Sequence, residues 1–270
     1  MDELEFAREL ACQAGDLLLE HYQVFGIKAG LKADRSVVTE ADLAADRLII
    51  QTIQESFPED TILSEELHPG ALTEGELHQR AVWIVDPLDG TTNFSLGLHI
   101  WGTLITRLVA GYPELTAMYF PLLGELYSSR RNQGAWMNGT QLHVQSPETG
   151  HPLPFFACCS RTFRQYSVSV PYKTRILGSS AYTFNLVARG MAIVGFEATP
   201  KIWDIAGSWL LVEEAGGSIE TLGAGNPFPV QPAVDYAMTN YPTIAAATPQ
   251  LASRTRLQIV PIREKSESNR

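Results

Sequence analysis

Long apolar runs are absent from this 270-residue sequence, and none approaches the roughly 20 residues that a membrane-spanning helix requires. Cysteine is scarce, and Cys12, Cys158 and Cys159 lack the spacing of a metal site, which favours a reduced, cytoplasmic setting. Basic residues are also few, with 20 Lys and Arg against 30 Asp and Glu and a formal net charge of −10. Because such a surface repels phosphate backbones and anionic lipids, we expect no membrane and no direct nucleic acid among its partners.

Two amphipathic helices are predicted at the start of the chain. Residues 1–23 place apolar side chains at helical spacing with acids between them, and they lack the pattern of a signal peptide. After a polar loop over residues 32–38, a second helix is expected with Thr39 as its N-cap, Asp42 at N3 and Pro58 ending it. We therefore expect two leading helices and no targeting segment.

Strands are predicted for the next part of the chain. Residues 61–66 and 81–87 are short, apolar segments that end in acids or proline. Residues 104–144 alternate between strand and turn patterns, with Asn138-Gly139 as a two-residue hairpin turn. This pattern predicts a meander.

A segment rich in Pro, Gly and polar residues, 147–154, is the best candidate for a subdomain boundary. Beyond it strand and helix patterns alternate up to a last helix near residues 249–259, and Gly216 or Gly217 is expected to end the penultimate helix. We expect one domain over residues 1–262, with subdomains of about 1–146 and 147–262, and a flexible tail at 263–270.

Five acidic residues stand where predicted elements begin or end: Asp42, Glu65, Asp86, Asp89 and Asp204. Each has an ordinary structural explanation. Asp42 and Asp204 fit as caps of helix N-termini, where a carboxylate is favoured by about 1 kcal/mol. Glu65 fits a solvated turn, and Asp89 followed by glycine fits a turn dipeptide. Taken singly, these residues do not define a site.

The pair Asp86 and Asp89 is harder to explain by structure alone. Asp86 follows an apolar strand, Pro87 restrains the chain, and Asp89 comes three residues after Asp86. Two carboxylates a few Å apart raise each other's pKa unless a cation neutralises both. With oxygen ligands and no His or Cys beside them, the expected cation is Mg²⁺ rather than Zn²⁺. Acids gathered at strand ends are typical of a two-metal phosphoryl-transfer site.

Gly90, Thr91 and Thr92 follow the two aspartates directly. A glycine lets backbone N–H groups approach an anion closely, and threonine hydroxyls add donors or hold a water. Because the acids without metal would repel a phosphate, we expect phosphate to bind here only together with the metal.

Two longer segments, "WIVDPLDGTTNF" at 83–94 and "WDIAGSWLLVEEAGG" at 203–217, together with "VVTEAD" and "SEE", resemble the signatures of the inositol monophosphatase family. This is a family of Mg²⁺-dependent, lithium-sensitive phosphatases, and the resemblance runs from the first helix to the last. It implies an α/β fold, the αβαβα sandwich of inositol monophosphatase and fructose-1,6-bisphosphatase, and usually a homodimer. It also implies hydrolysis of a phosphate monoester by in-line attack of a metal-activated water, without a covalent phosphoenzyme.

The resemblance implies roles for individual residues as well. About two to three Mg²⁺ ions would be held by Glu65, Asp86, the backbone carbonyl of Leu88, Asp89 and Asp204, with Asp86 as a bridge. Asp42, Thr91 and Glu65 form the implied catalytic set, in which Asp42 and Thr91 orient the attacking water and help to deprotonate it. The implied substrate-binding set is Asp89, Gly90, Thr91, Thr92, Ser179, Ser180, Glu197 and Asp204.

Selectivity for the alcohol is expected to depend on Glu197, which resembles a glutamate that holds ring hydroxyls in the family. Its ordinary explanation is an acid in solvent at a strand end. Two segments depart from the family pattern: "SLGLHIWGTLI", with His99 and Trp101 where a proline is frequent, and the "TPKIWD" lead-in to Asp204. We therefore expect the entrance of the pocket to differ from that of the relatives.

The leading hypothesis is a phosphatase of myo-inositol monophosphates. Alternatives in the same family are phosphatases of histidinol phosphate, of fructose or sedoheptulose bisphosphate, and of adenosine 3′,5′-bisphosphate. Phosphatases of adenosine 3′,5′-bisphosphate often have lysine at the position of Thr92, so threonine there disfavours this alternative. A sugar bisphosphatase would need cations for the second phosphate, and Lys173, Arg175 and Lys201 are available. An alternative of a different class is a regulatory binding module associated with the transcription machinery, against which the five acids and Thr91 argue.

Overall fold

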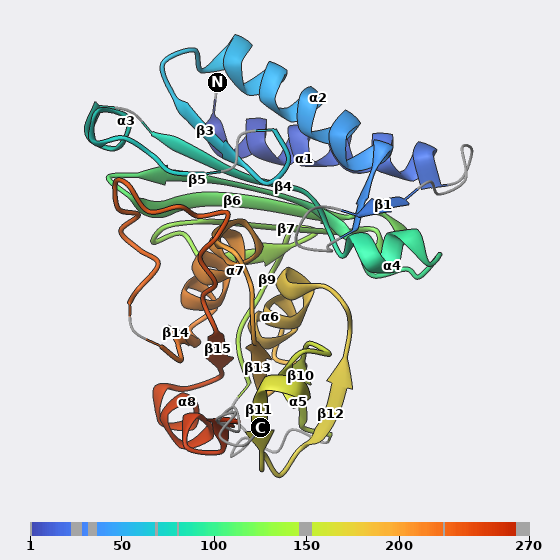
Figure 1. The fold of residues 1–270 in the computed structure, drawn as a ribbon, viewed down its shortest axis with the longest axis vertical. Coiled ribbons are helices and arrows are strands. Elements are labelled where there is room, and N and C mark those ends of the chain that lie inside the picture. The colour runs from blue at the N-terminus through green and yellow to red at the C-terminus, as the bar shows by residue number, and fades with distance from the viewer. Residues whose placement is uncertain are drawn as a thin grey trace, which may run out of the picture.

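The computed structural model of this chain describes residues 2–22, 29–31, 37–67, 70–79, 81–145, 153–223 and 225–262. The expected tail and residues 147–152 of the expected boundary lie outside these ranges. The elements stack in alternating layers of helices and sheets (Figure 1). This is the predicted αβαβα sandwich.

The first helical layer consists of α1 (Glu3–Glu20) and α2 (Glu40–Ser56), as the apolar periodicity predicts. Both pack on one face of a seven-stranded sheet, which α1 contacts chiefly at its centre (Figure 1). In α2 the predicted capping box is present, because Thr39 and Asp42 exchange hydrogen bonds. This sheet consists, in spatial order, of β3 (Thr61–Ser64), β4 (Val82–Asp89), β5 (Gly102–Val109), β6 (Tyr112–Phe120), β7 (Glu125–Arg130), β8 (Ala135–Met137) and β9 (Thr140–Gln141).

The middle layer consists of α6 (Ser180–Ala188) and α7 (Ile202–Glu214), which pack against each other between the two sheets. Gly216, in the left-handed conformation, follows the end of α7, which selects it over Gly217 as the terminating glycine. The second sheet has the order β12 (Lys173–Ile176), β10 (Phe155–Cys158), β13 (Val194–Glu197), β15 (Thr243–Ala246) and β14 (Ser218–Thr221). The outer layer contains α5 (Thr162–Gln165) and α8 (Pro249–Arg256).

The remaining elements are short. They are β1 (Ala29–Leu31), paired with β2 (Val37–Thr39), β11 (Tyr166–Val168), paired with β16 (Ile259–Pro261), the helices α3 (Glu74–Gln79) and α4 (Thr91–Ser95), and a 3₁₀ turn at Pro121–Leu123. The assignment of Val37 and Val38 to a polar loop is therefore wrong, because they belong to strand β2 and pair with residues 31 and 30 of β1. No helix among the described residues is long and apolar enough to cross a membrane.

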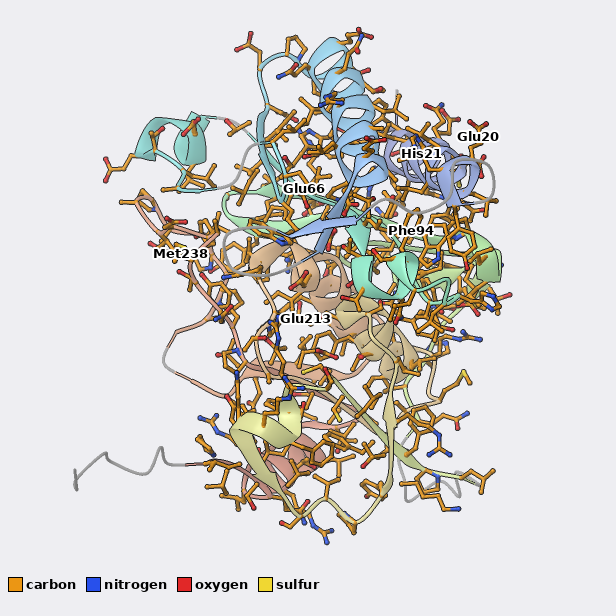
Figure 2. The ribbon with its side chains drawn as sticks, turned by 45° about the vertical axis from the view of Figure 1, so that its right-hand side comes forward. Glu20, His21, Glu66, Phe94, Glu213 and Met238 are labelled. Carbon is orange, nitrogen blue, oxygen red and sulfur yellow. The ribbon has the colours of Figure 1, made fainter. Side chains whose placement is uncertain are left out.

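Strand β4 positions the site, and all eight of its residues are buried. It is longer than the sequence predicts, because the strand continues through Pro87 to Asp89 with a register shift against β5 between Asp86 and Asp89. Pro87 has no N–H to donate to the ladder. It is tolerated because the pairing with β5 is interrupted at this position, between Asp86 and Asp89. Glu66 and Phe94, labelled in Figure 2, mark the turn after β3 and the helix α4 that border the end of β4.

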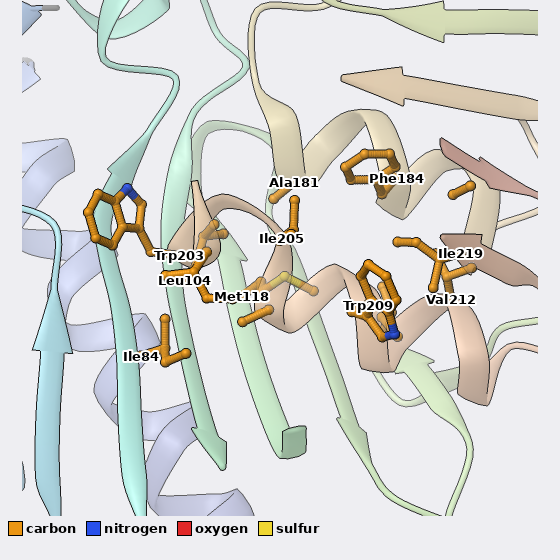
Figure 3. Packing of buried hydrophobic residues seen from close by; sticks show 14 of the residues in the cluster. Ile84, Leu104, Met118, Ala181, Phe184, Trp203, Ile205, Trp209, Val212 and Ile219 are labelled. Carbon is orange, nitrogen blue, oxygen red and sulfur yellow. The ribbon is translucent and has the colours of Figure 1, made fainter. Parts of the chain in front are cut away.

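The main core lies between the two sheets and around α7 (Figure 3). Ile205 of α7 packs with Leu104 and Met118 of the first sheet, whereas Phe184 and Ile219 belong to the part of the cluster nearer the second sheet. The residues of α7 are thus buried on almost every side, which explains the apolar character of "IAGSWLLV". This burial fixes the start of α7, and with it Asp204.

We predict that Gly207→Ala destabilises the protein. A methyl group at Gly207 would lie 2.5 Å from Thr116 Oγ1 and 2.9 Å from Thr106 Oγ1, in the buried interface of α7 with β5 and β6. The overpacking, worth about 1–3 kcal/mol, should outweigh the gain of about 1 kcal/mol in helix propensity. Urea unfolding measures the difference. Gly75→Ala in α3, where the added methyl meets nothing within 4 Å, is the control and should be neutral or stabilising; equal stability of the two variants would contradict this account of the interface.

Candidate active site

Three acids meet at the end of β4. Asp86, Asp89 and Asp204 each place one carboxylate oxygen so that the three oxygens lie within 4.8 Å of one another. Asp86 and Asp89 are 1% and 5% exposed, and Asp204, in the first turn of α7, is partly buried. The structure thus joins the pair predicted from the sequence with an acid from a distant helix.

These carboxylates have shifted pKa values. Burial raises the pKa of Asp86 well above its ordinary value of 3.8, and the charges of Glu65, Asp204 and Asp89 raise it further. Burial and the charges of Glu65 and Asp89 do the same to the pKa of Asp204. Burial raises the pKa of Asp89 to about 6, although hydrogen bonds from the start of α6 lower it. Carboxylates at such short distances repel one another until a cation binds between them. Carboxylate oxygens are also the ligands that Mg²⁺ prefers.

Asp89 is held at the N-terminus of α6. The Ser179 hydroxyl and the backbone N–H groups of Ser180 (3.0 Å) and Ala181 (3.1 Å) donate to its carboxylate. A helix N-terminus carries partial positive charge and unpaired N–H donors, so it partly offsets the negative charge. Ser179 and Ser180, predicted to line the pocket, do so and also orient Asp89.

Asp42 and Asp204 each use one oxygen for a helix start. The Lys201 N–H donates to Asp204 Oδ2 at 2.6 Å, and the Thr39 N–H donates to Asp42 Oδ2 at 2.9 Å. Asp42 Oδ1 lies 3.3 Å from the Thr91 hydroxyl, across the site. Capping and a role in the site are therefore compatible, because a carboxylate has two oxygens.

The segment after Asp89 turns sharply into α4. Gly90 has φ +88°, and a Cβ there would lie 2.8 Å from the Ile100 carbonyl oxygen, so glycine is required. The Thr91 hydroxyl lies 2.9 Å from the Leu88 carbonyl oxygen, and the Leu88 N–H donates to Asp86 Oδ1 at 3.0 Å. This short network links the predicted phosphate-binding residues to the acids.

Glu65 lies at the edge of the group. Its N–H donates to the Val85 carbonyl at 3.1 Å, in register with the parallel pairing of β3 and β4. Glu65 is not one of the three acids that converge within 4.8 Å. Its charge nevertheless raises the pKa of Asp42, Asp86, Asp89 and Asp204, so it belongs to the same electrostatic centre.

A pocket of about 800 Å³ opens over these acids. Gly90, Thr91 and Thr92 line it together with Glu65 and with Glu197, the last residue of β13. Glu197 is only 4% exposed at the end of β13, so its explanation as an acid in solvent is wrong. Burial raises the pKa of Glu197 to about 8, against hydrogen bonds from neighbouring side chains that lower it. The Ser180 hydroxyl lies 3.4 Å from its carboxylate.

Of the two residues named at the expected change in the pocket entrance, one lines the pocket. His99 lines the pocket, but Trp101 is fully buried and packs on Phe94 and Tyr22 instead. Cys159 also lines the pocket, while burial raises the pKa of both vicinal thiols, that of Cys158 to about 12, so neither is an activated thiolate.

Two residues with a place in the site were given no role from the sequence. Arg161 is the only Lys or Arg that lines the pocket within the described part of the chain, and its Nη1 donates to Thr199 Oγ1 at 2.8 Å. The proposed cations Lys173, Arg175 and Lys201 do not line it. A basic residue three positions after the end of the largely buried strand β10 was the available signal.

Asn93 is the second such residue. Its Nδ2 donates to the carbonyls of Ile100 and Leu177, both at 2.7 Å, and so ties α4 to the segment before α6. A Cβ at Gly178 would meet Asn93 Oδ1 at 2.5 Å. Asn93 lies inside the "DGTTNF" motif, but nothing in the sequence indicates that its amide bonds to residues as distant as Leu177.

Fold and site together define a layered α/β protein with a candidate divalent-metal centre, and the comparisons agree. The profile of the inositol monophosphatase family matches residues 1–256. A histidinol-phosphatase of Chlorobaculum parvum is 32% identical over 234 residues, covering 80% of this chain and 84% of that protein. The Nus factor SuhB of Escherichia coli (strain K12) is 32% identical over 244 residues, covering 83% and 87%. The solved IMPase of Thermotoga maritima is 26% identical with a TM-score of 0.74, over 92% of each chain. The chain belongs to the inositol monophosphatase family, a family of phosphatases.

We predict that Mg²⁺ stabilises the protein more at pH 7.5 than at pH 5. A carboxyl group whose pKa is raised on folding binds its proton more tightly in the folded state, so the metal-free protein loses stability as the pH rises from about 4 through the raised pKa values. Mg²⁺ replaces the protons and removes this loss. Melting temperatures in EDTA and in Mg²⁺ at both pH values test it; an Mg²⁺ effect that is equal at the two pH values would contradict it.

Proposed function

We propose that the chain is a Mg²⁺-dependent phosphomonoesterase that releases phosphate from small polyhydroxylated alcohols, with myo-inositol monophosphate as the leading substrate. The observation that carries the proposal is the convergence of Asp86, Asp89 and Asp204 beside a turn that only glycine can make. Glu65, Asp86, the Leu88 carbonyl, Asp89 and Asp204 are the proposed ligands of about two to three ions. Bound there, Mg²⁺ would neutralise the acids, attract the phosphate and make a water more acidic.

The chain's own residues then supply the rest of the chemistry. Thr91, which contacts the Leu88 carbonyl and the Asp42 carboxylate, is the proposed residue that orients a water, and Asp42 is the proposed acceptor of the proton of that water. Burial raises the pKa of Asp42 to about 6, and a general base works best when its pKa is near the operating pH. Gly90, Thr91 and Thr92 offer backbone N–H groups and hydroxyls to the phosphate oxygens.

On the alcohol side, Glu197 and Ser180 are the proposed contacts of the leaving group. A buried acid beside a serine hydroxyl binds hydroxyl groups well and leaves an unpaired polar group when the substrate has none. This supports a polyol in preference to a simple alkyl or aryl phosphate. We also expect Li⁺ to inhibit this phosphatase activity.

A second candidate is a sugar bisphosphate, which the position of Arg161 favours. No carboxylate among the described residues forms an ion pair with this guanidinium, and it faces a pocket that is otherwise acidic. The regulatory alternative has support from the name Nus factor, which the Escherichia coli relative and relatives in other bacteria carry. Acids that converge on one point favour catalysis over a binding module.

We predict that Asp89→Asn and Asp204→Asn each reduce Mg²⁺-dependent phosphate release to near background. Each change removes a charged ligand and leaves an amide that binds Mg²⁺ weakly. Phosphate release from inositol-1-phosphate measures the effect, and circular dichroism checks that the variants are folded. Near wild-type turnover of either folded variant would refute the metal assignment.

We also predict that Glu197→Ala raises KM for inositol-1-phosphate about tenfold or more and leaves KM for p-nitrophenyl phosphate nearly unchanged, because only the first substrate has hydroxyls to lose. Arg161→Ala is the matched variant in the same pocket, at a charged residue of opposite sign. It should raise KM for fructose-1,6-bisphosphate and spare inositol-1-phosphate. Equal effects of Glu197→Ala on both monophosphates would remove the case for a polyol. If fructose-1,6-bisphosphate is the better substrate of the wild type and Arg161→Ala selectively loses its turnover, the second candidate would be favoured.

A further inference from the structure

Helix α2 directs two buried acids toward the site, and the proposed chemistry uses only one of them. Asp42 faces Thr91, and Asp46 follows one turn later on the same side of the helix. Asp46 is 0% exposed. A carboxylate is rarely buried to this degree unless it makes specific hydrogen bonds, since an apolar side chain would fill the same space at a lower desolvation cost.

The hydrogen bonds of Asp46 lie on both sides of Glu65. Its Oδ2 accepts from the Ser64 hydroxyl at 3.0 Å and from the Leu67 N–H at 2.9 Å. Ser64 is the last residue of β3, and Leu67 lies beyond the turn that contains Glu65 and Glu66. One carboxylate oxygen therefore clamps both ends of the turn.

The other side of this turn is fixed by β4. Ser64 pairs with Val85, and the Glu65 N–H donates to the Val85 carbonyl, one residue before Asp86. The backbone of Glu65 is thus held between the strand that carries Asp86 and the helix that carries Asp42. Glu65 itself lies just beyond the last residue of β3.

We propose that Asp46 is a positioning residue that fixes Glu65 relative to Asp86 and Asp89 and thereby sets the affinity of the site for divalent metal. The inference rests on the proposed function, in which Glu65 is a metal ligand. Groups that orient metal ligands typically change metal affinity about 10- to 100-fold when they are removed. Through Asp42 and Asp46, α2 then sets the position of the Thr91 turn and of the Glu65 turn together.

The test is calorimetric titration of the metal-free protein with Mn²⁺ and Mg²⁺, which requires no turnover. Asp46→Ala should weaken metal binding about 10- to 100-fold, while Asp46→Asn, which retains an oxygen acceptor, should stay within about threefold of wild type. Ser64→Ala removes one of the two hydrogen bonds and should give a smaller loss, and it decides the matter if Asp46→Ala does not fold.

Asp60→Ala is the matched control for a purely structural effect. Asp60 is also a largely buried acid with two hydrogen bonds, from Trp83 Nε1 and Arg107 Nε at 2.9 Å each, but it lies at the opposite end of β3 and β4. It should lower the melting temperature and leave metal affinity unchanged. Unchanged affinity in the folded Asp46→Ala, or in Ser64→Ala if Asp46→Ala does not fold, or equal losses in Asp46→Ala and Asp60→Ala, would overturn the inference.

Asp86→Asn separates this inference from the proposed function. If wild type binds metal and Asp86→Asn does not, the metal centre stands, and the Asp46 and Ser64 variants decide whether Asp46 positions Glu65. If wild type binds no metal, the proposed function and the inference both fail.

Discussion

The repulsion between buried carboxylates is the constraint on which the rest of this structure depends. Asp86, Asp89 and Asp204 converge at one point with Glu65 nearby, and burial first, then the charges of neighbouring acids, raise their pKa values. The fold offsets part of this repulsion with helix N-termini. α6 donates to Asp89, and the starts of α2 and α7 bond to Asp42 and Asp204. A divalent cation would supply the remainder.

The layered architecture brings these helix starts together. α2 lies on one face of the seven-stranded sheet and α6 and α7 on the other, and all three begin beside the end of β4 (Figure 1). Asp42 and Asp204 each use one oxygen for a helix start and keep the other for the site, whereas both oxygens of Asp89 accept from the start of α6. Local helix stability and the proposed chemistry therefore depend on the same residues, so variants at these positions need a check of folding beside the check of activity.

Much of this site could be predicted because its residues are close in sequence or stand at clear element ends. Asp86, Asp89 and Gly90 to Thr92 lie in one short segment, and the periodicity of α1 and α2 is strong. The residues on the alcohol side could not be placed in the same way. Whether Glu197 is buried depends on β13 lying inside the second sheet. Arg161 lines the pocket, whereas in β12 the last residue, Ile176, lines it and Lys173 and Arg175 do not. The clamp by Asp46 likewise depends on a contact between residues distant in sequence.

The central claim is that the acids at the end of β4 form a divalent-metal centre. The most direct measurement is anomalous diffraction from crystals soaked in Mn²⁺, recorded near the manganese absorption edge. The account predicts a strong anomalous peak between the carboxylates of Asp86, Asp89 and Asp204, and a second peak adjoining Glu65. A well-ordered site with no peak among these three carboxylates, or with manganese bound elsewhere instead, would contradict it.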